Sequence, residues 1–177
     1  MRKFLVLLLT FFIHGTIFSQ EWLTFEDSSS SFTAKYPASW TKKIRTDGIV
    51  VFSSPISGDK DNFKENINII VRKNALFTKD FDLKEALPSI IDKLNSSLTD
   101  FKQNSSRFFK WNGLDAAEIK FTVTNKAEDQ DNPLPLKMMQ WYCSGEGVFY
   151  TATFTAHRDN NQFDAEALEL FQSIRFR

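Results

Sequence analysis

The sequence predicts an α+β fold in which an antiparallel β-sheet of about six to seven strands is flanked by helices. Two observations support this prediction. Several segments alternate apolar and polar side chains with a period of two, which is typical of strands with one buried face. Two further segments repeat apolar side chains every three or four residues, as on a helix that lies on a core. Strands, a helix, more strands and a second helix, in this order, indicate the α+β class.

The first 19 residues are expected to be a signal peptide rather than part of the fold. Arg2 and Lys3 precede an apolar run of about ten residues, and Glu21 follows soon after it. The run is too short for a membrane span, which needs roughly 20 residues. We therefore expect cleavage after Ser19, a single domain over residues 20–177, and a soluble periplasmic or extracellular protein without a stable membrane anchor.

The net charge bears on the class of partner, and the cysteine content bears on the cellular location. The chain has 22 basic and 22 acidic side chains, and loss of Arg2 and Lys3 with the signal peptide leaves a net charge of −2. Because there is also no basic block, nucleic acid is not an expected partner. Cys143 is the single cysteine, so an internal disulfide is excluded and no thiol near the cleavage site is available for lipid attachment. An exported chain without disulfides favours a bacterial envelope.

Five short strands are expected in the N-terminal part of the domain. Turn-forming residues separate them: Asp27 with four serines, Pro37, Gly48 and the polar loop 57–65. Trp40, shortly after Pro37, is expected to pack back on the core as an anchor. The strands are expected at 22–26, 31–36, 41–45, 49–53 and 67–72.

A helix is expected from 83 to 98, where apolar side chains recur at three- and four-residue spacing. Asp82 is a suitable N-cap and Glu85 lies three residues after it, a pattern that satisfies the free N–H groups of a first turn. Pro88 conflicts with a regular helix because it lacks an N–H and clashes with the preceding turn. Either the helix kinks at Pro88 or its regular part begins there.

Four alternating strands and a second helix are expected after this helix. Asn112 and Gly113 form the strongest short hairpin signal, since both residues tolerate a positive φ. The strands are expected at 107–111, 117–123, 137–143 and 148–157. Along the second of them, one face carries Ala117, Ile119, Phe121 and Val123. The final helix is expected to be capped by Asn161, with an apolar side that consists of Phe163, Ala167, Leu170, Phe171 and Ile174.

These segments resemble the PsbP-like family. Phe32–Pro37 followed by Trp40 is similar to the F-x-x-x-Y-P-x-x-W pattern that opens this family. Three later segments are similar in content and order: 66–71, Asn112-Gly113 and 163–176. The resemblance covers nearly the whole chain after the signal peptide. It implies an antiparallel sheet flanked by helices, an architecture shared with a nuclear import factor that binds a small GTPase, and it implies a non-catalytic binding or assembly module.

No catalytic constellation stands out in the sequence. His157 is the single histidine after the signal peptide, and Cys143 and Asp159 supply the types of a nucleophile and an orienting carboxylate. Alternation places Cys143 and His157 near opposite faces of their strands, and a cysteine close to Met139 and Trp141 is typically a small buried apolar side chain. The chain is therefore not expected to be an enzyme. An enzyme of unknown chemistry is the last of three functional hypotheses.

Metal and cofactor sites are not expected. Glu128, Asp129 and Asp131 form an acidic loop, but it lacks the glycine and the distant glutamate of an EF-hand. Histidine and cysteine are too few for a transition-metal site, and no glycine-rich phosphate loop occurs. We interpret the acidic loop as a hydrated hairpin tip and expect no cofactor.

The aromatic content is the feature that most favours a binding function. Of the 19 phenylalanines, four lie in the expected signal peptide; the other 15, with four tryptophans, exceed what strand alternation alone can bury. Met138, Tyr142 and Phe149 fall on the threonine-rich faces of their strands, where they either form an interaction surface or pack under the helices. We expect the partner to be a protein of the cell envelope. The alternative is a carrier or chaperone of apolar ligands or segments.

Overall fold

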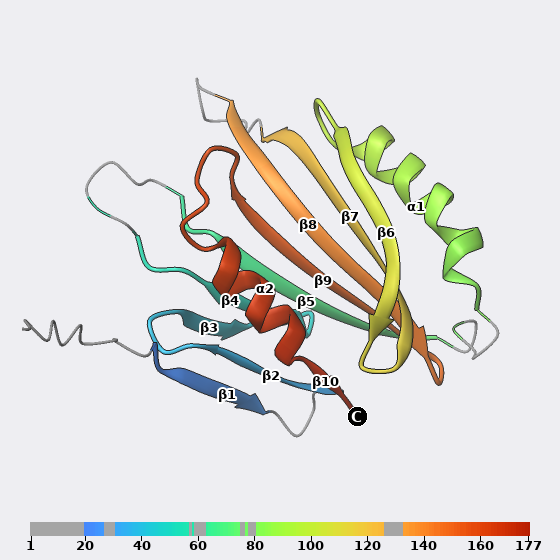
Figure 1. Cartoon of the computed structure of the whole chain (residues 1–177), viewed down its shortest axis with the longest axis horizontal. Coiled ribbons are helices and arrows are strands. Elements are labelled where there is room, and N and C mark those ends of the chain that lie inside the picture. The colour runs from blue at the N-terminus through green and yellow to red at the C-terminus, as the bar shows by residue number, and fades with distance from the viewer. Residues whose placement is uncertain are drawn as a thin grey trace, which may run out of the picture.

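The computed structural model describes residues 20–26, 31–56, 58, 63–74, 77, 81–125 and 133–177. The expected signal peptide lies outside these residues. Within them, neither helix is long and apolar enough to cross a membrane. The described elements are, in chain order (Figure 1), β1 Trp22–Glu26, β2 Phe32–Pro37, β3 Thr41–Ile44, β4 Val50–Ser53, β5 Asn66–Lys73, α1 Leu83–Ser97, β6 Lys102–Trp111, β7 Leu114–Asn125, β8 Leu134–Gly145, β9 Val148–His157, α2 Asp164–Ser173 and β10 Arg175–Phe176.

The strands form two antiparallel sheets. A seven-stranded sheet has the order β3-β4-β5-β9-β8-β7-β6, and a three-stranded sheet has the order β1-β2-β10. Every pair of neighbouring strands is antiparallel. The predicted α+β class, with an antiparallel sheet of six to seven strands flanked by helices, is confirmed. The small sheet is an addition, because β2 pairs with β1 and β10 and not with a strand of the large sheet.

The large sheet has an apolar core on each face. Alternating residues of its central strands point to opposite sides, so that Trp141 belongs to the first core and Tyr142 to the second. The first core lies between the large sheet, α2 and the small sheet, and the second lies under α1 (Figure 1). The predicted shared face of β7 is confirmed, since the second core contains Ala117, Ile119, Phe121 and Val123.

The helix α1 continues through Pro88 without a break. The predicted N-cap is confirmed, because the Asp82 carboxylate accepts a hydrogen bond of 2.7 Å from the backbone N–H of Lys84. Glu85 lies in the first turn, where a negative charge interacts favourably with the helix dipole. Pro88 is exposed and lies inside the helix, so the alternative that the regular helix begins at Pro88 is wrong.

The hairpin between β6 and β7 turns where the sequence predicts. Asn112 and Gly113 have φ values of 52° and 84°. The Asn112 side-chain amide donates a hydrogen bond to the carbonyl of Ile174, which ties the turn to the segment after α2. β6 begins at Lys102, earlier than the predicted start at Arg107. The prediction missed its first residues because they are polar and show no apolar alternation.

The helix α2 begins later than the predicted cap. Asn161 is not the N-cap; that position is occupied by Phe163, which makes no side-chain capping hydrogen bond. The Asn161 side chain instead accepts a hydrogen bond from Lys137 Nζ on β8. A turn in which the Asn160 side chain accepts a 3.0 Å hydrogen bond from the backbone N–H of Gln162 precedes the helix. The asparagine that was expected to cap the helix is thus used to fix its approach to the sheet.

Trp40 is the anchor that the sequence predicts. Its side chain is 3% exposed, and its Nε1 donates a hydrogen bond of 2.7 Å to Glu166 on α2. Its ring meets the ring of Phe163 edge-on at a centroid distance of 5.8 Å. The turn between β2 and β3 is thereby fixed to α2.

Candidate binding groove

An open apolar groove lies between α1 and the face of the large sheet that β5, β8 and β9 form. Its volume is about 640 Å³. The sheet contributes Tyr142, Phe149 and Thr151 to the lining, and α1 contributes Ile90 and Leu94. A concave, mainly apolar surface of this size is the usual form of a binding site.

The groove exists because α1 covers the sheet unevenly. Leu83 and Leu87, in the N-terminal half of the helix, are each 5% exposed and pack in the second core. Ile90 and Leu94 continue the same apolar stripe but are only half-buried. The C-terminal half of α1 therefore stands next to the sheet without closing on it, which leaves apolar side chains of both elements accessible to an occupant.

Phe149 is the centre of an aromatic cluster in the groove. Its ring centroid lies 4.9 Å from that of Phe77, 5.8 Å from that of Phe81 and 6.1 Å from that of Tyr142. The rings of Phe77 and Phe81 also meet edge-on at 5.4 Å. These separations fall in the range of favourable ring contacts, so the cluster forms a preorganised apolar wall.

The floor of the groove is uncharged. Tyr142 is 5% exposed, and its hydroxyl donates a hydrogen bond to the side-chain carbonyl of Gln140. Burial raises the pKa of Tyr142 far above its ordinary value, so the phenol stays protonated at neutral pH. An apolar occupant meets no buried charge on this floor.

The rim of the groove is positively charged. Arg72 on β5 and Lys93 on α1 line the groove and are exposed. Neither forms a salt bridge with any residue in the described ranges. Both cations are therefore available to an acidic group of an occupant.

The three residues predicted to form an interaction surface do not all meet in the groove. Tyr142 and Phe149 line it together. Met138 packs in the same core but lines a separate cavity of about 260 Å³. Sequence reasoning missed Phe77 and Phe81, which lie between β5 and α1 and show no strand or helix period. Their aromatic character was the one signal in the sequence that these half-buried residues contribute to a site.

The candidate catalytic residues are not brought together. In the β8–β9 register Cys143 pairs with Tyr150 and His157 pairs with Leu136, so Cys143 and His157 lie at opposite ends of the two strands. Cys143 is 0% exposed, and burial raises its pKa far above the ordinary value. Asp159 offers no carboxylate contact to His157; its backbone N–H donates to His157 Nδ1 at 3.4 Å.

Acidic residues do not assemble a metal site in the part of the chain that the structure describes, where no group of three or more histidine, cysteine or acidic side chains is placed to hold an ion. The predicted hydrated loop with Glu128, Asp129 and Asp131 lies outside the described residues.

Comparison with known proteins identifies the architecture. No family model and no curated protein matches the sequence. The solution structure of cyanobacterial PsbP from Synechocystis sp. PCC 6803 aligns over 92% of this chain and 96% of its own length, with a TM-score of 0.61 and 14% identity. The chain has the PsbP-like fold. At this identity the likeness concerns the fold alone.

Two further structures are similar in fold. LpqN of Mycobacterium tuberculosis, described as involved in cell envelope biogenesis, has a TM-score of 0.59 and 15% identity, with 87% of each chain covered. A protein of Bacteroides thetaiotaomicron VPI-5482 has a TM-score of 0.56 and 19% identity over 87% of this chain and 48% of that one. This chain therefore spans about half the length of the Bacteroides protein.

The residues on which the sequence resemblance to the PsbP-like family rests have structural roles in the fold. Tyr36 and Pro37 end β2, and Trp40 packs on α2. The Asn66–Val71 segment lies within β5, between β4 and β9 in the large sheet. Asn112 makes the turn of a hairpin. These positions are explained by packing and turn geometry, and of them only Ile70, in the Asn66–Val71 segment, lines the groove.

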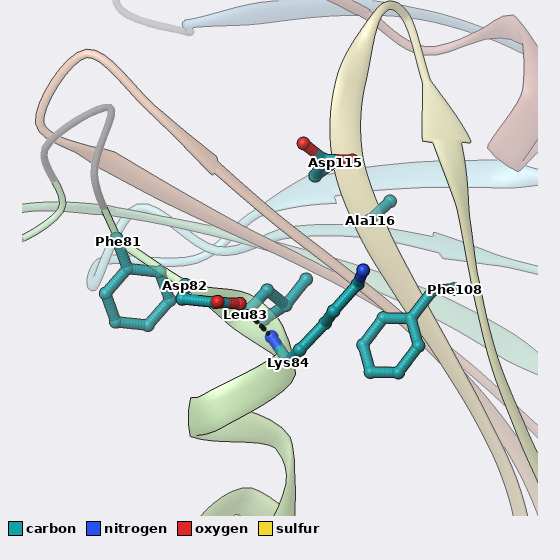
Figure 2. Close-up of a pocket in the computed structure, with 7 residues that line it drawn as sticks. All are labelled: Phe81, Asp82, Leu83, Lys84, Phe108, Asp115 and Ala116. Carbon is teal, nitrogen blue, oxygen red and sulfur yellow. Dashed lines mark hydrogen bonds between the residues drawn. The ribbon is translucent and has the colours of Figure 1, made fainter.

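A smaller pocket of about 300 Å³ lies at the N-terminal end of α1 (Figure 2). Figure 2 shows the Lys84 side chain extended beside the ring of Phe108, and its Nζ lies 6.0 Å from that ring centroid. The two carboxylates of the pocket already have partners: Asp82 caps the helix and Asp115 forms a 2.9 Å salt bridge with Lys110. Helix capping and surface pairing account for this pocket.

Proposed function

We propose that this protein is a non-catalytic binding module of the bacterial envelope, and that the groove beside α1 holds the apolar face of a segment of a partner protein. The observation that carries the proposal is the incomplete cover of the sheet by α1, which leaves the aromatic cluster around Phe149 open. Aromatic side chains in a concave surface are the residue types that contribute most to protein binding.

The open shape of the groove favours a protein over a small ligand. Sites for small ligands enclose most of the ligand surface, about 70–90% of it. An acyl chain or other small apolar molecule in this groove would leave one side in water. When a segment of a folded partner binds, the rest of the partner shields the side of the segment that faces away from the groove. An amphipathic helix that binds in a groove likewise turns its polar face to water.

The charges at the rim specify the chemistry of the partner segment. Arg72 and Lys93 flank the aromatic cluster on the two walls. A segment with apolar side chains on one face and acidic side chains beside them matches both features, because the acidic groups then pair with cations that have no salt bridge among the described residues.

The envelope location rests on the sequence and on a fold neighbour. Residues 1–19 have the charge and apolar pattern of a signal peptide. LpqN, which shares the fold, is described as involved in cell envelope biogenesis. A PhoA fusion to the first residues of the chain measures export, and an inactive fusion contradicts the proposed location.

Site-specific photo-crosslinking in the native cell tests the function. A photoreactive amino acid replaces Ile90 in the groove and, as a control, Lys42 on β3 at the edge of the sheet. We expect a discrete crosslinked protein from position 90 and not from position 42. Purified partner should then bind this protein, with about tenfold loss of affinity in Phe149→Asp and no loss in Leu168→Asp, which places the same charge on an exposed apolar residue of α2.

A second variant separates a loss of binding from a loss of the fold, which Phe149→Asp alone could cause. Arg72→Glu alters an exposed side chain, so the fold should remain while affinity for an acidic segment falls, most strongly at low salt. Unchanged affinity in both Phe149→Asp and Arg72→Glu contradicts the proposal. Native mass spectrometry decides the competing hypothesis: a small apolar molecule that travels with the protein, without a groove-specific crosslink, reassigns the site to ligand carriage.

A further inference from the structure

A further cavity, of about 720 Å³, lies at the end of the molecule where several segments converge. The tips of the β6–β7 and β8–β9 hairpins, the end of β5 and the strand β10 meet there (Figure 1). These segments are far apart in the sequence. The cavity adjoins the first core, whereas the α1 groove lies on the other face of the large sheet. It is therefore a separate site.

Tyr150 places an unpartnered donor in this cavity. Its side chain is 3% exposed, and its ring lies against that of Phe176 at a centroid distance of 4.1 Å. Its hydroxyl forms no hydrogen bond with any residue in the described ranges. In the same ranges, no fully buried side-chain oxygen or nitrogen lacks a partner. The Tyr150 hydroxyl must consequently open on accessible space, and Tyr150 lines this cavity.

The hydroxyl of Tyr150 is suited to an acceptor group. Burial raises the pKa of this phenol, and the neighbouring Cys143 and Glu146 raise it further. The group is therefore protonated at neutral pH and can donate a hydrogen bond to an acceptor that enters the cavity, such as a carboxylate or phosphate oxygen.

The cavity also has more positive than negative side chains. Lys73, Arg175 and Arg177 line it, against the single carboxylate of Glu146. Arg175 is held in place because its Nη1 donates hydrogen bonds to the carbonyls of Gln172 and Ile174 at 2.7 and 2.8 Å.

Arg177 and Lys73, two of the basic residues that line this cavity, differ in whether they form a salt bridge. Arg177 pairs with the exposed Glu26 of β1, whereas Lys73 has no salt bridge within the described residues. A cavity with more basic than acidic side chains, into which a hydroxyl donor opens, favours an anion.

We propose that this cavity binds a small organic anion, with the Tyr150 hydroxyl donating a hydrogen bond to its carboxylate or phosphate and Lys73 and Arg175 balancing its charge. The ring of Phe176 and the side chain of Val148 provide the apolar surface for the body of the ligand. The volume lies within the range of small-molecule sites, roughly 300–1,000 Å³. The site is independent of the partner-binding groove, and either can exist without the other.

Titration of the purified protein with 2-naphthoate and with 2-naphthyl phosphate, followed by amide chemical shifts, tests the site. Saturable shifts are expected for at least one anion at the hairpin tips around Asn112 and Gly145, and none for neutral 2-naphthalenemethanol at the same concentration. The head group that binds more tightly identifies the ligand class. No saturable binding of either anion, or equal binding of the neutral compound, overturns the proposal.

Tyr150→Phe is the decisive variant because it removes only the hydroxyl. Loss of a hydrogen bond to a charged group predicts at least about tenfold weaker anion binding. Tyr142→Phe, the same change in the α1 groove, should leave anion affinity unchanged. Equal affinity in Tyr150→Phe with an unchanged thermal unfolding curve overturns the assignment. Arg175→Gln tests separately whether Arg175 balances the charge of the anion. We expect it to weaken anion binding while the fold is retained, and unchanged binding contradicts this role.

Discussion

Glu118 is a charged residue inside the first core region. Alternation places it on the polar face of β7, yet it is 3% exposed. Its carboxylate accepts hydrogen bonds from Trp141 Nε1 at 2.6 Å and from Arg107 Nε at 2.8 Å. Burial opposes ionisation, but these hydrogen bonds and the charge of Lys120 outweigh it, so the pKa of Glu118 is lowered. The carboxylate therefore stays ionised in the folded protein.

Replacement of Glu118 is expected to change how stability depends on pH. Because its folded-state pKa lies below the unfolded value of 4.5, the contribution of Glu118 is complete above that value and is lost as the pH falls through the folded-state pKa. Glu118→Gln should thus be less stable than the wild type at about pH 7, with a difference in urea unfolding that shrinks as the pH falls below 4.5. Lys110→Gln, at an exposed ion pair, is the control; an equal shrinkage there argues against this role of Glu118.

Alternation predicts the face that a residue occupies but not what covers that face. It correctly puts Cys143 and His157 on opposite sides of the sheet, as the burial of Cys143 and its register show. Alternation does not predict which of Asn160 and Asn161 forms the turn before α2, because both residues are common in turns. In the fold Asn160 forms this turn, and the Asn161 side chain instead accepts a hydrogen bond from Lys137 on another strand.

At the scale of an element, the β6–β7 turn allows separate tests of backbone shape and tethering. Gly113 has a φ of 84° and nothing within 4 Å of an added Cβ, so Gly113→Ala costs conformational energy alone, about 1–2 kcal/mol. Asn112→Gly keeps the turn shape but loses the side-chain hydrogen bond to Ile174, at a cost of about 1 kcal/mol. Urea unfolding measures both. A neutral Gly113→Ala is incompatible with this turn geometry.

Pro88 is a second test of element stability. It lies inside α1, where it removes a backbone hydrogen bond, and it is exposed, so no packing is lost on replacement. We expect Pro88→Ala to raise the free energy of unfolding by about 1–3 kcal/mol and to raise the helical signal in circular dichroism. Ser89→Ala, at the adjacent exposed position, should change stability by less than about 0.5 kcal/mol. A gain of similar size in both variants contradicts the interpretation.

The elements that the sequence predicts are those with a clear period or a specific turn. β7 and β9 alternate over most of their length, α1 has a full apolar stripe, and Asn112-Gly113 marks a turn. β10 could not be predicted, because its two residues have no period and it forms only through pairing with β2. The first half of β6 was missed because its exposed side chains are all polar, so only backbone pairing with β7 defines it.

For the whole molecule, the first core predicts that the two sheets unfold together. Phe25 of the small sheet meets Phe32 at a ring-centroid distance of 5.3 Å and Phe52 of the large sheet at 5.8 Å. Tryptophan fluorescence and far-ultraviolet circular dichroism should therefore follow one coincident thermal transition. Phe25→Ala should destabilise the entire domain by about 3–5 kcal/mol. An early, separate transition of the small sheet is the result that this shared core does not allow.

The candidate sites show the limit of sequence reasoning at this scale. Tyr142 and Phe149 could be grouped by their shared face, but the position of α1 relative to the sheet decides that they line a groove. Alternation places Tyr150 on one face of its strand with Ala152 and Phe154, but nothing in that strand indicates that its hydroxyl lacks a partner. That property depends on β10 and on two hairpin tips, which meet only in the complete fold.

The buried thiol of Cys143 makes this protein suitable for spectroscopy by site-directed labelling. It is the single cysteine of the chain, it is 0% exposed, and burial raises its pKa, so maleimides and methanethiosulfonates react with it slowly in the native state. New cysteines at exposed positions can thus be labelled without removal of the native one. Spin labels at Ser97→Cys on α1 and Thr151→Cys on β9 would span the two walls of the α1 groove and keep both rim cations. Their separation, with and without a bound partner, would report directly whether the groove widens on binding.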